Sequence, residues 1–158
     1  MRARLVLPAL VAAVLAAGAC SRPVSSEQFV SADKREANGL YRFKLDLSDS
    51  LATYDVSFYS RIDAGRLKLE NNRDLPMMVT WSAPSGRRYR ETVYFVLSDE
   101  SPGSDTFSGQ FVKPYRTGLV PAEYGEWELN VLVNSGADYP GFRGLGVICK
   151  KNLSDGSR

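Results

Sequence analysis

The side chains with the strongest intrinsic chemistry in this 158-residue chain are two cysteine thiols, Cys20 and Cys149. The chain contains no histidine. That composition excludes Ser-His-Asp and Cys-His catalysis and removes the commonest transition-metal ligand. Cys149 alternates with Val147 and Leu145, which predicts a small buried side chain rather than a reactive thiol. We therefore expect chemistry at Cys20.

Cys20 closes an apolar run over residues 5–20. Arg2 and Arg4 precede the run and small residues end it, a pattern typical of a secretory signal. The run is too short to cross a bilayer, which needs ~20 apolar residues. The ending Ala-Ala-Gly-Ala-Cys resembles a bacterial lipobox. That resemblance implies removal of residues 1–19 and acylation of Cys20, so that membrane lipid is the first partner and Cys149 has no disulfide partner.

Three arginines, Arg87, Arg88 and Arg90, are concentrated in residues 85–90. They could bind phosphate on lipid headgroups or an acidic surface of another protein. The alternative is a solubilising turn without a partner. Tyr94 lies between the apolar residues Val93 and Phe95, and successive strand residues face opposite sides. We therefore expect Tyr94 to be exposed. These three arginines and Tyr94 are the candidate partner-binding residues.

Other candidate sites have simpler explanations. Acidic residues in 98–105 could bind calcium, but they lack the spacing of an EF-hand loop and match a solvated turn. Aromatic residues could stack on a glycan. Both tryptophans nevertheless fall on the same alternate strand positions as aliphatic residues, which predicts that they lie in the core. No two carboxylates can be placed across a cleft. The acidic residues are Asp99, Glu100 and Asp105. The aromatic residues are Trp81, Trp127, Tyr89, Tyr94, Tyr115, Tyr124 and Tyr139, and the remaining carboxylates are Glu123, Glu126 and Glu128.

Apolar and polar residues alternate with period two in several segments, and no helical periodicity extends beyond a turn or two. In residues 126–134, one face carries Trp127, Leu129, Val131 and Val133. In residues 54–62, the alternation places Tyr59 outward with its hydroxyl in water. The turn Pro-Ser-Gly at 84–86 between two alternating arms predicts a hairpin, and Pro114 indicates an edge strand.

Seven or eight such strands predict an all-β fold, an antiparallel β-sandwich or jelly roll, with an eight-stranded barrel as the alternative. We expect a signal peptide at 1–19, a lipidated polar tether at 20–38 with room for a short strand at its centre, the sandwich at 39–152 and a flexible tail at 153–158.

Loss of residues 1–19 lowers the basic count from 20 to 18, equal to the 18 acidic residues. This balance does not indicate nucleic-acid binding.

Four fragments follow the lipobox in a characteristic order: YDVSFYSRI at 54–62, APSGR at 83–87, GEWELNVLV at 125–133 and GFRGLGVICKK at 141–151. Over residues 40–151 this order resembles the gliding-motility lipoprotein GldH family. The resemblance implies an outer-membrane lipoprotein that is an accessory or structural part of an envelope machine, with no catalytic residues to transfer.

The first functional hypothesis is therefore a lipid-tethered, non-enzymatic sandwich that contacts another envelope protein, with no cofactor, metal or small-molecule substrate. Ser21 follows the cysteine, where an Asp would favour the inner membrane, so we expect the outer membrane. The alternative is a glycan-binding module, which requires Trp81 and Trp127 to be exposed.

Overall fold

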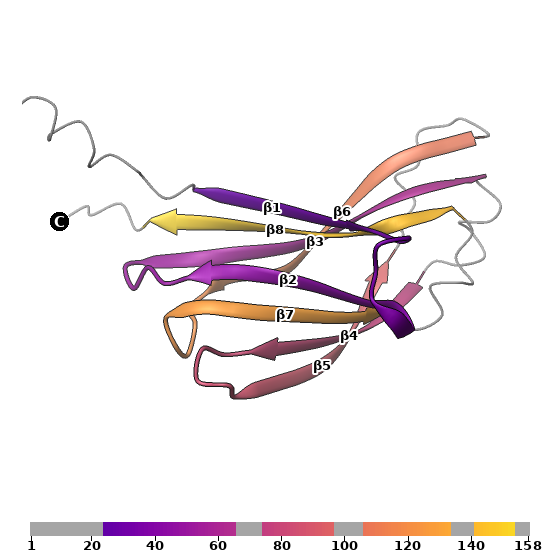
Figure 1. Cartoon of the computed structure of the whole chain (residues 1–158). Coiled ribbons are helices and arrows are strands. Elements are labelled where there is room, and N and C mark those ends of the chain that lie inside the picture. Colours follow the sequence, from indigo (N-terminus) through magenta and orange to yellow (C-terminus); the bar gives the residue numbers. More distant parts are fainter. Residues whose placement is uncertain (1–23, 66–73, 97–105, 134–140, 154–158) are drawn as a thin grey trace, which may run out of the picture.

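A computed structural model describes residues 24–65, 74–96, 106–133 and 141–153 (Figure 1). Two four-stranded antiparallel sheets account for most of these residues. The first sheet has the order β1 (Ser25–Ser31), β8 (Phe142–Leu153), β3 (Ala52–Gly65) and β6 (Thr106–Leu119). The second has the order β2 (Leu40–Leu47), β7 (Gly125–Val133), β4 (Asp74–Ser82) and β5 (Arg88–Val96). The 3-10 turn η2 (Ala37–Gly39) precedes β2. The predicted β-sandwich is confirmed.

The strand order is that of a jelly roll. Strand β4 pairs with β5, β3 with β6, β2 with β7, and β1 with β8, all antiparallel. The chain thus resembles one long hairpin whose tip is the β4–β5 turn and whose successive pairs are distributed between two sheets.

The inward row of each strand fills one core between the sheets. On β7 these residues are Trp127, Leu129, Val131 and Val133, each at most 5% exposed, as the alternation predicts. Cys149 is also buried, beside Val147 and Leu145 of the same cluster. Apolar residues from both sheets belong to this single cluster, so burial of the two inner faces holds the sheets together.

β1 lies inside the segment expected to be a tether. It pairs with β8 in continuous register from Ser25↔Lys150 to Ser31↔Gly144, so the strand expected at the centre of 20–38 is present. β8 extends to Leu153. The sandwich therefore begins at Ser25 and ends at Leu153, bounds that differ from 39–152.

The β4–β5 hairpin forms at the predicted Pro-Ser-Gly turn. The Ala83 N–H donates to the Arg87 carbonyl and the Gly86 N–H donates to the Ala83 carbonyl, both at 2.8 Å. Gly86 has a φ of +85°, a conformation that a residue with a side chain rarely adopts. This is a three-residue loop with glycine at its left-handed position.

The prediction that the Tyr59 hydroxyl lies in water is wrong. Tyr59 is on the outward row of β3, but it is 0% exposed. Gly146 on β8 has no side chain, and the Tyr59 ring occupies the space where its Cβ would lie. Phe29 of β1 covers the ring, with centroids 5.6 Å apart. Burial, together with the nearby Glu27 carboxylate, raises the pKa of Tyr59 to about 12.

Candidate functional site

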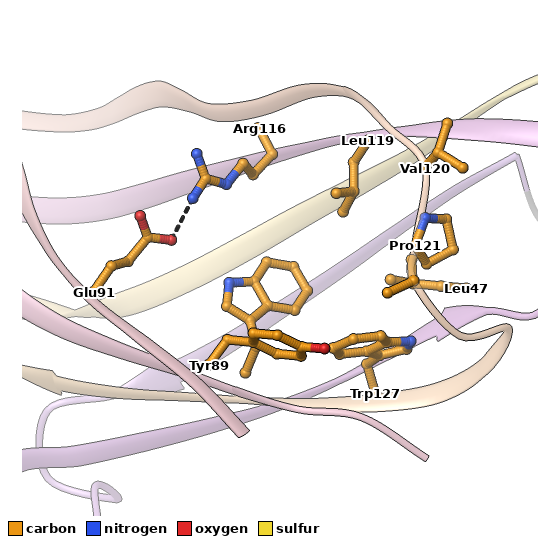
Figure 2. A pocket seen from close by; sticks show the side chains of 10 residues that line it. Leu47, Tyr89, Glu91, Arg116, Leu119, Val120, Pro121 and Trp127 are labelled. Carbon is orange, nitrogen blue, oxygen red and sulfur yellow. Dashed lines mark hydrogen bonds and ion pairs between the residues drawn. The ribbon is translucent and has the colours of Figure 1, made fainter. Parts of the chain in front are cut away.

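A cavity of about 280 Å³ opens between β5 and β6, near the β4–β5 hairpin (Figure 2). We call it the β5–β6 groove. Strands β5 and β6 are edge strands of different sheets, so the groove occupies one open side of the sandwich. The lining residues are Leu47, Trp81, Tyr89, Glu91, Arg116, Leu119, Val120, Pro121, Ala122 and Trp127.

Aromatic rings form the floor of the groove. Tyr89 and Trp127 stack with centroids 6.1 Å apart and an interplanar angle of 28°, and Figure 2 shows the two rings side by side. Trp81 meets Trp127 edge-on at 5.9 Å. The Trp127 indole N–H donates to the Glu123 carbonyl at 2.8 Å. The two tryptophan rings of the floor are buried and each indole N–H has a hydrogen-bond acceptor, so these two rings are held in place by the fold.

A polar bridge closes one end of the groove and connects the two sheets. The Trp81 indole N–H donates to the Tyr115 hydroxyl at 2.7 Å, and that hydroxyl donates to the Glu91 carboxylate. Arg116 pairs with the same carboxylate at 2.5 Å. Burial, and next the Glu91 carboxylate, raise the pKa of Tyr115 above its usual range. Tyr115 therefore stays protonated near neutral pH and keeps its hydroxyl hydrogen for the bond to Glu91.

The backbone of β5 is open on the side away from β4. Among the described residues no strand pairs there. In an antiparallel ladder, residue pairs that exchange hydrogen bonds alternate with pairs that do not. Ala83 and Arg87 form a hydrogen-bonded pair, so the next pair along β5, Arg88 with Ser82, is not hydrogen-bonded. The N–H and C=O groups of alternate β5 residues, including Arg88, Arg90 and Tyr94, therefore point outward. Pro76, which has no N–H, faces Tyr94 in one of the pairs that exchange no hydrogen bond between β4 and β5.

The opposite side of the sandwich is closed. The Gln28 side chain of β1 donates to the Lys44 carbonyl of β2 at 2.5 Å and accepts from the Lys44 N–H at 3.1 Å. One amide side chain thus satisfies a backbone donor and acceptor of the β2 edge. On the open side, Pro114 interrupts the donors of β6, an edge position as predicted. The free edge best suited to pairing is β5.

The structure brings the predicted partner-binding residues together on this edge. Arg87 lies in the hairpin turn, and Arg88, Arg90 and Tyr94 lie on the outer face of β5. All four are exposed, with Tyr94 at 63%. Arg88 and Arg90 face Ser82 and Thr80 on β4, and within the described segments neither makes an ion pair. Among the described residues, the edge therefore presents two arginine charges that form no ion pair.

Trp81 and Trp127 lie in the core. Their exposed fractions are 7% and 5%, as their parity predicts. The described residues therefore offer no exposed tryptophan pair on which a glycan could stack. Cys20, the acidic residues Asp99, Glu100 and Asp105, and Tyr139 lie outside the described residues.

The remaining carboxylates of the sequence analysis have structural partners. Glu123 accepts from the Ser85 N–H and hydroxyl at 3.1 and 2.7 Å. Glu126 pairs with Lys44 at 2.9 Å and Glu128 lies 3.7 Å from Arg42, both on the outer face of the second sheet. In the part of the chain that the structure describes, no three metal-ligating side chains gather.

The sequence analysis missed Glu91 and Arg116. Glu91 shares the inward parity of Tyr89 and Val93, and a carboxylate on an apolar face indicates a buried partner. That partner could not be identified, because β5 and β6 become neighbours only across the gap between the sheets. The Gln28 contact with β2 had no signal in the sequence.

None of the described segments forms a helix that is long and apolar enough to cross a membrane. No family model matches the chain, and no curated protein matches it. Among solved structures, the chain is similar to dimeric latent PorU from Porphyromonas gingivalis, with a TM-score of 0.35 and 9% identity. The match covers 82% of this chain and 13% of PorU.

Proposed function

We propose that this protein is a lipid-anchored, non-enzymatic binding module of the bacterial cell envelope. It docks on another envelope protein through β5 and the β5–β6 groove. One observation carries the proposal: the β1–β2 side is closed by Gln28, whereas the β5 side combines an open backbone edge with an aromatic cavity.

The partner segment is an extended strand that adds to β5. Its backbone would pair with the outward groups of alternate β5 residues. Its side chains would alternate between the outer face, beside Arg88 and Arg90, and the inner face, towards the groove. Charge complementarity favours acidic residues on the first row, and the groove favours an apolar residue on the second.

The anchor and the location come from the sequence. The lipobox at Cys20 supports acylation, and Ser21 supports the outer membrane. The resemblance to the GldH family supports an accessory or structural role in an envelope assembly of the gliding or secretion type. In this proposal no catalytic residue, cofactor or small-molecule substrate is involved.

Crosslinking from the native membrane tests the docking edge. A photoreactive phenylalanine replaces Thr92 or Tyr94 on β5, and Glu27 on β1 as the control. We expect Thr92 and Tyr94 to form an adduct with the same protein, on residues two apart in one segment, because a paired strand keeps this register. No adduct at native expression, or an equal adduct from Glu27, would contradict the proposal.

A charge reversal and an anchor variant complete the test. The double variant Arg88→Glu/Arg90→Glu should abolish the adduct at Thr92, while Lys34→Glu, an exposed charge between β1 and η2, should retain it. Cys20→Ser should move the protein from the membrane to the soluble fraction. An intact mass without an acyl group on Cys20 would contradict the anchoring part of the proposal. The docking part would then be decided by the crosslinking result alone.

A further inference from the structure

One end of the sandwich lies next to the point where the chain leads back to Cys20. The Lys151 N–H donates to the Val24 carbonyl at 2.7 Å, and Tyr54 pairs with both Lys151 and Leu119. Residues 48–51 lie just before Tyr54 in the chain and residues 120–124 just after Leu119. Both loops are therefore at the same end of the sandwich as Val24. Figure 1 shows the β4–β5 hairpin at this end too. We call it the anchor end, formed by Val24, residues 48–51, 83–87 and 120–124, and Leu153.

Exposed apolar side chains gather at the anchor end. Nine large hydrophobic residues are exposed in the described segments, and five of them are here. Leu51 is 79% exposed and Val120 is 62% exposed. The other three are Val24, Tyr124 and Leu153 at 55%, 47% and 58%. Single exposed apolar residues are ordinary, but a cluster at one pole of a soluble domain marks a contact surface.

Internal hydrogen bonds hold these loops in place. The Leu51 N–H donates to the Asp49 carboxylate at 3.0 Å, and Asp49 pairs with Lys151 at 3.2 Å. Glu123 ties the 120–124 loop to Ser85 of the hairpin turn at 2.7 Å. Leu51 and Val120 are thus presented to solvent by ordered turns, so binding there costs little conformational entropy.

Covalent geometry keeps the anchor end close to the lipid. Cys20 is four residues before Val24, so their Cα atoms lie within about 14 Å of each other. Arg87 and Lys150 are exposed at the same end, where anionic headgroups would attract them. Two of the acidic groups there, Asp49 and Glu123, already have partners.

We infer that the anchor end is a membrane-contact surface, on which Leu51, Val120 and Tyr124 enter the headgroup region of the bilayer that holds the acylated Cys20. The inference rests on the proposed anchoring. Shallow insertion of apolar residues beside a lipid anchor supplies a second membrane contact, and tyrosine suits the interface because its ring is apolar and its hydroxyl polar. This contact fixes the orientation of the sandwich and holds β5 at a defined angle to the membrane.

Environment-sensitive fluorescence tests the contact. Acylated protein with Leu51→Cys, Val120→Cys or the control Val96→Cys is labelled with a nitrobenzoxadiazole dye, since Cys149 is buried. Val96 is an exposed valine, 43%, at the far end of β5. Each protein is reconstituted in phosphatidylethanolamine–phosphatidylglycerol vesicles. We expect blue-shifted emission and quenching by brominated lipid at 51 and 120, and neither at 96.

The outcomes separate this inference from the proposed anchoring. Protein that floats with the vesicles but shows equal, water-like emission at all three positions overturns the membrane contact and leaves the anchor intact. Protein that carries no lipid and does not float overturns the anchoring. A second variant, Leu51→Asp/Val120→Asp, should transfer between vesicles about tenfold faster than the parent protein, because it loses part of the burial of two apolar side chains. Unchanged transfer would contradict the contact.

Discussion

The indole N–H of Trp81 on β4 donates a 2.7 Å hydrogen bond to the hydroxyl of Tyr115 on β6. The two residues belong to different sheets, and their rings also stack with centroids 6.0 Å apart. The contact ties the second sheet to the first at the closed end of the β5–β6 groove. Removal of the hydroxyl therefore tests how the open side of the sandwich is kept together.

Tyr115→Phe should lower the free energy of unfolding by about 1–3 kcal/mol, because it leaves the Trp81 N–H without its acceptor and removes a donor to Glu91. Urea denaturation of the variant and the parent measures the difference. Tyr124→Phe, on an exposed tyrosine, is the matched control and should change the stability by less than about 0.5 kcal/mol. Equal values for the two variants would show that the bridge does not stabilise the fold.

Gln28→Glu should open the closed side of the sandwich. The substitution keeps the shape but replaces the amide donor that faces the Lys44 carbonyl with an acceptor. We expect faster amide hydrogen exchange at Lys44 and along β1, measured by NMR. Gln110→Glu on the exposed edge strand β6 is the matched control. Unchanged exchange at Lys44 would contradict the role of the Gln28 amide.

Gly146→Ala should destabilise the fold by about 1–3 kcal/mol, the usual cost of an overpacked site. The added Cβ would lie 2.3 Å from the Tyr59 ring and 2.8 Å from the Gln28 carbonyl oxygen. The ring could rotate, but the β1 backbone oxygen cannot move without a break in pairing. Thermal unfolding measures the loss, and the double variant Gly146→Ala/Tyr59→Ala should recover little because the backbone clash persists.

Asp55→Asn should lower stability at neutral pH and have no effect in acid. Asp55 accepts from the Gly118 N–H at 2.8 Å and the Asn152 amide at 2.7 Å. These bonds hold the pKa of Asp55 below its usual value of 3.8. A depressed pKa gives stability that is present above pH 3.8 and is lost as the pH falls through the lower native pKa.

Urea denaturation of the parent and Asp55→Asn between pH 7 and pH 2 measures this dependence. The difference should be constant at the upper end and shrink below about pH 4. Glu126→Gln, which removes an exposed ion pair with Lys44, should differ from the parent by less than about 0.5 kcal/mol throughout. A constant difference between the parent and Asp55→Asn down to pH 2 would contradict the assignment.

The Cys149 thiol should react only after unfolding. Burial, and next the carboxylates of Asp46 and Asp55, raise the pKa of Cys149 to about 11, so the native thiol is neutral and inaccessible at pH 8. We expect no reaction of the native acylated protein with a disulfide reagent, and one thiol per chain in guanidinium. Two thiols after unfolding would show that Cys20 carries no thioether-linked lipid.

Local patterns in the sequence were sufficient for the strands and the hairpin. The alternation around Trp127 and Cys149 predicted which side chains are buried, because a strand with one buried face repeats every two residues. The turn at 84–86 predicted the β4–β5 hairpin for a similar reason, since the conformation depends on adjacent residues.

Features that depend on distant residues could not be predicted. Tyr59 is buried because Gly146, far away in the sequence, leaves space for its ring. Glu91, Tyr115 and Arg116 meet because two edge strands face each other across the sheets, and alternation does not specify that pairing. The predicted arginines were identifiable, but their position on an open backbone edge required the strand order.

The place of β1 determines how the proposed anchor would resist a mechanical load. The strand pairs with β8 over seven consecutive positions, and a force on Cys20 would reach it at Ser25, at one end of the strand axis. Ladder hydrogen bonds run perpendicular to the strands. A pull on Cys20 along that axis would load all these bonds in shear, together, instead of peeling them apart one by one. An outermost strand can therefore transmit tension between a membrane and a docked protein.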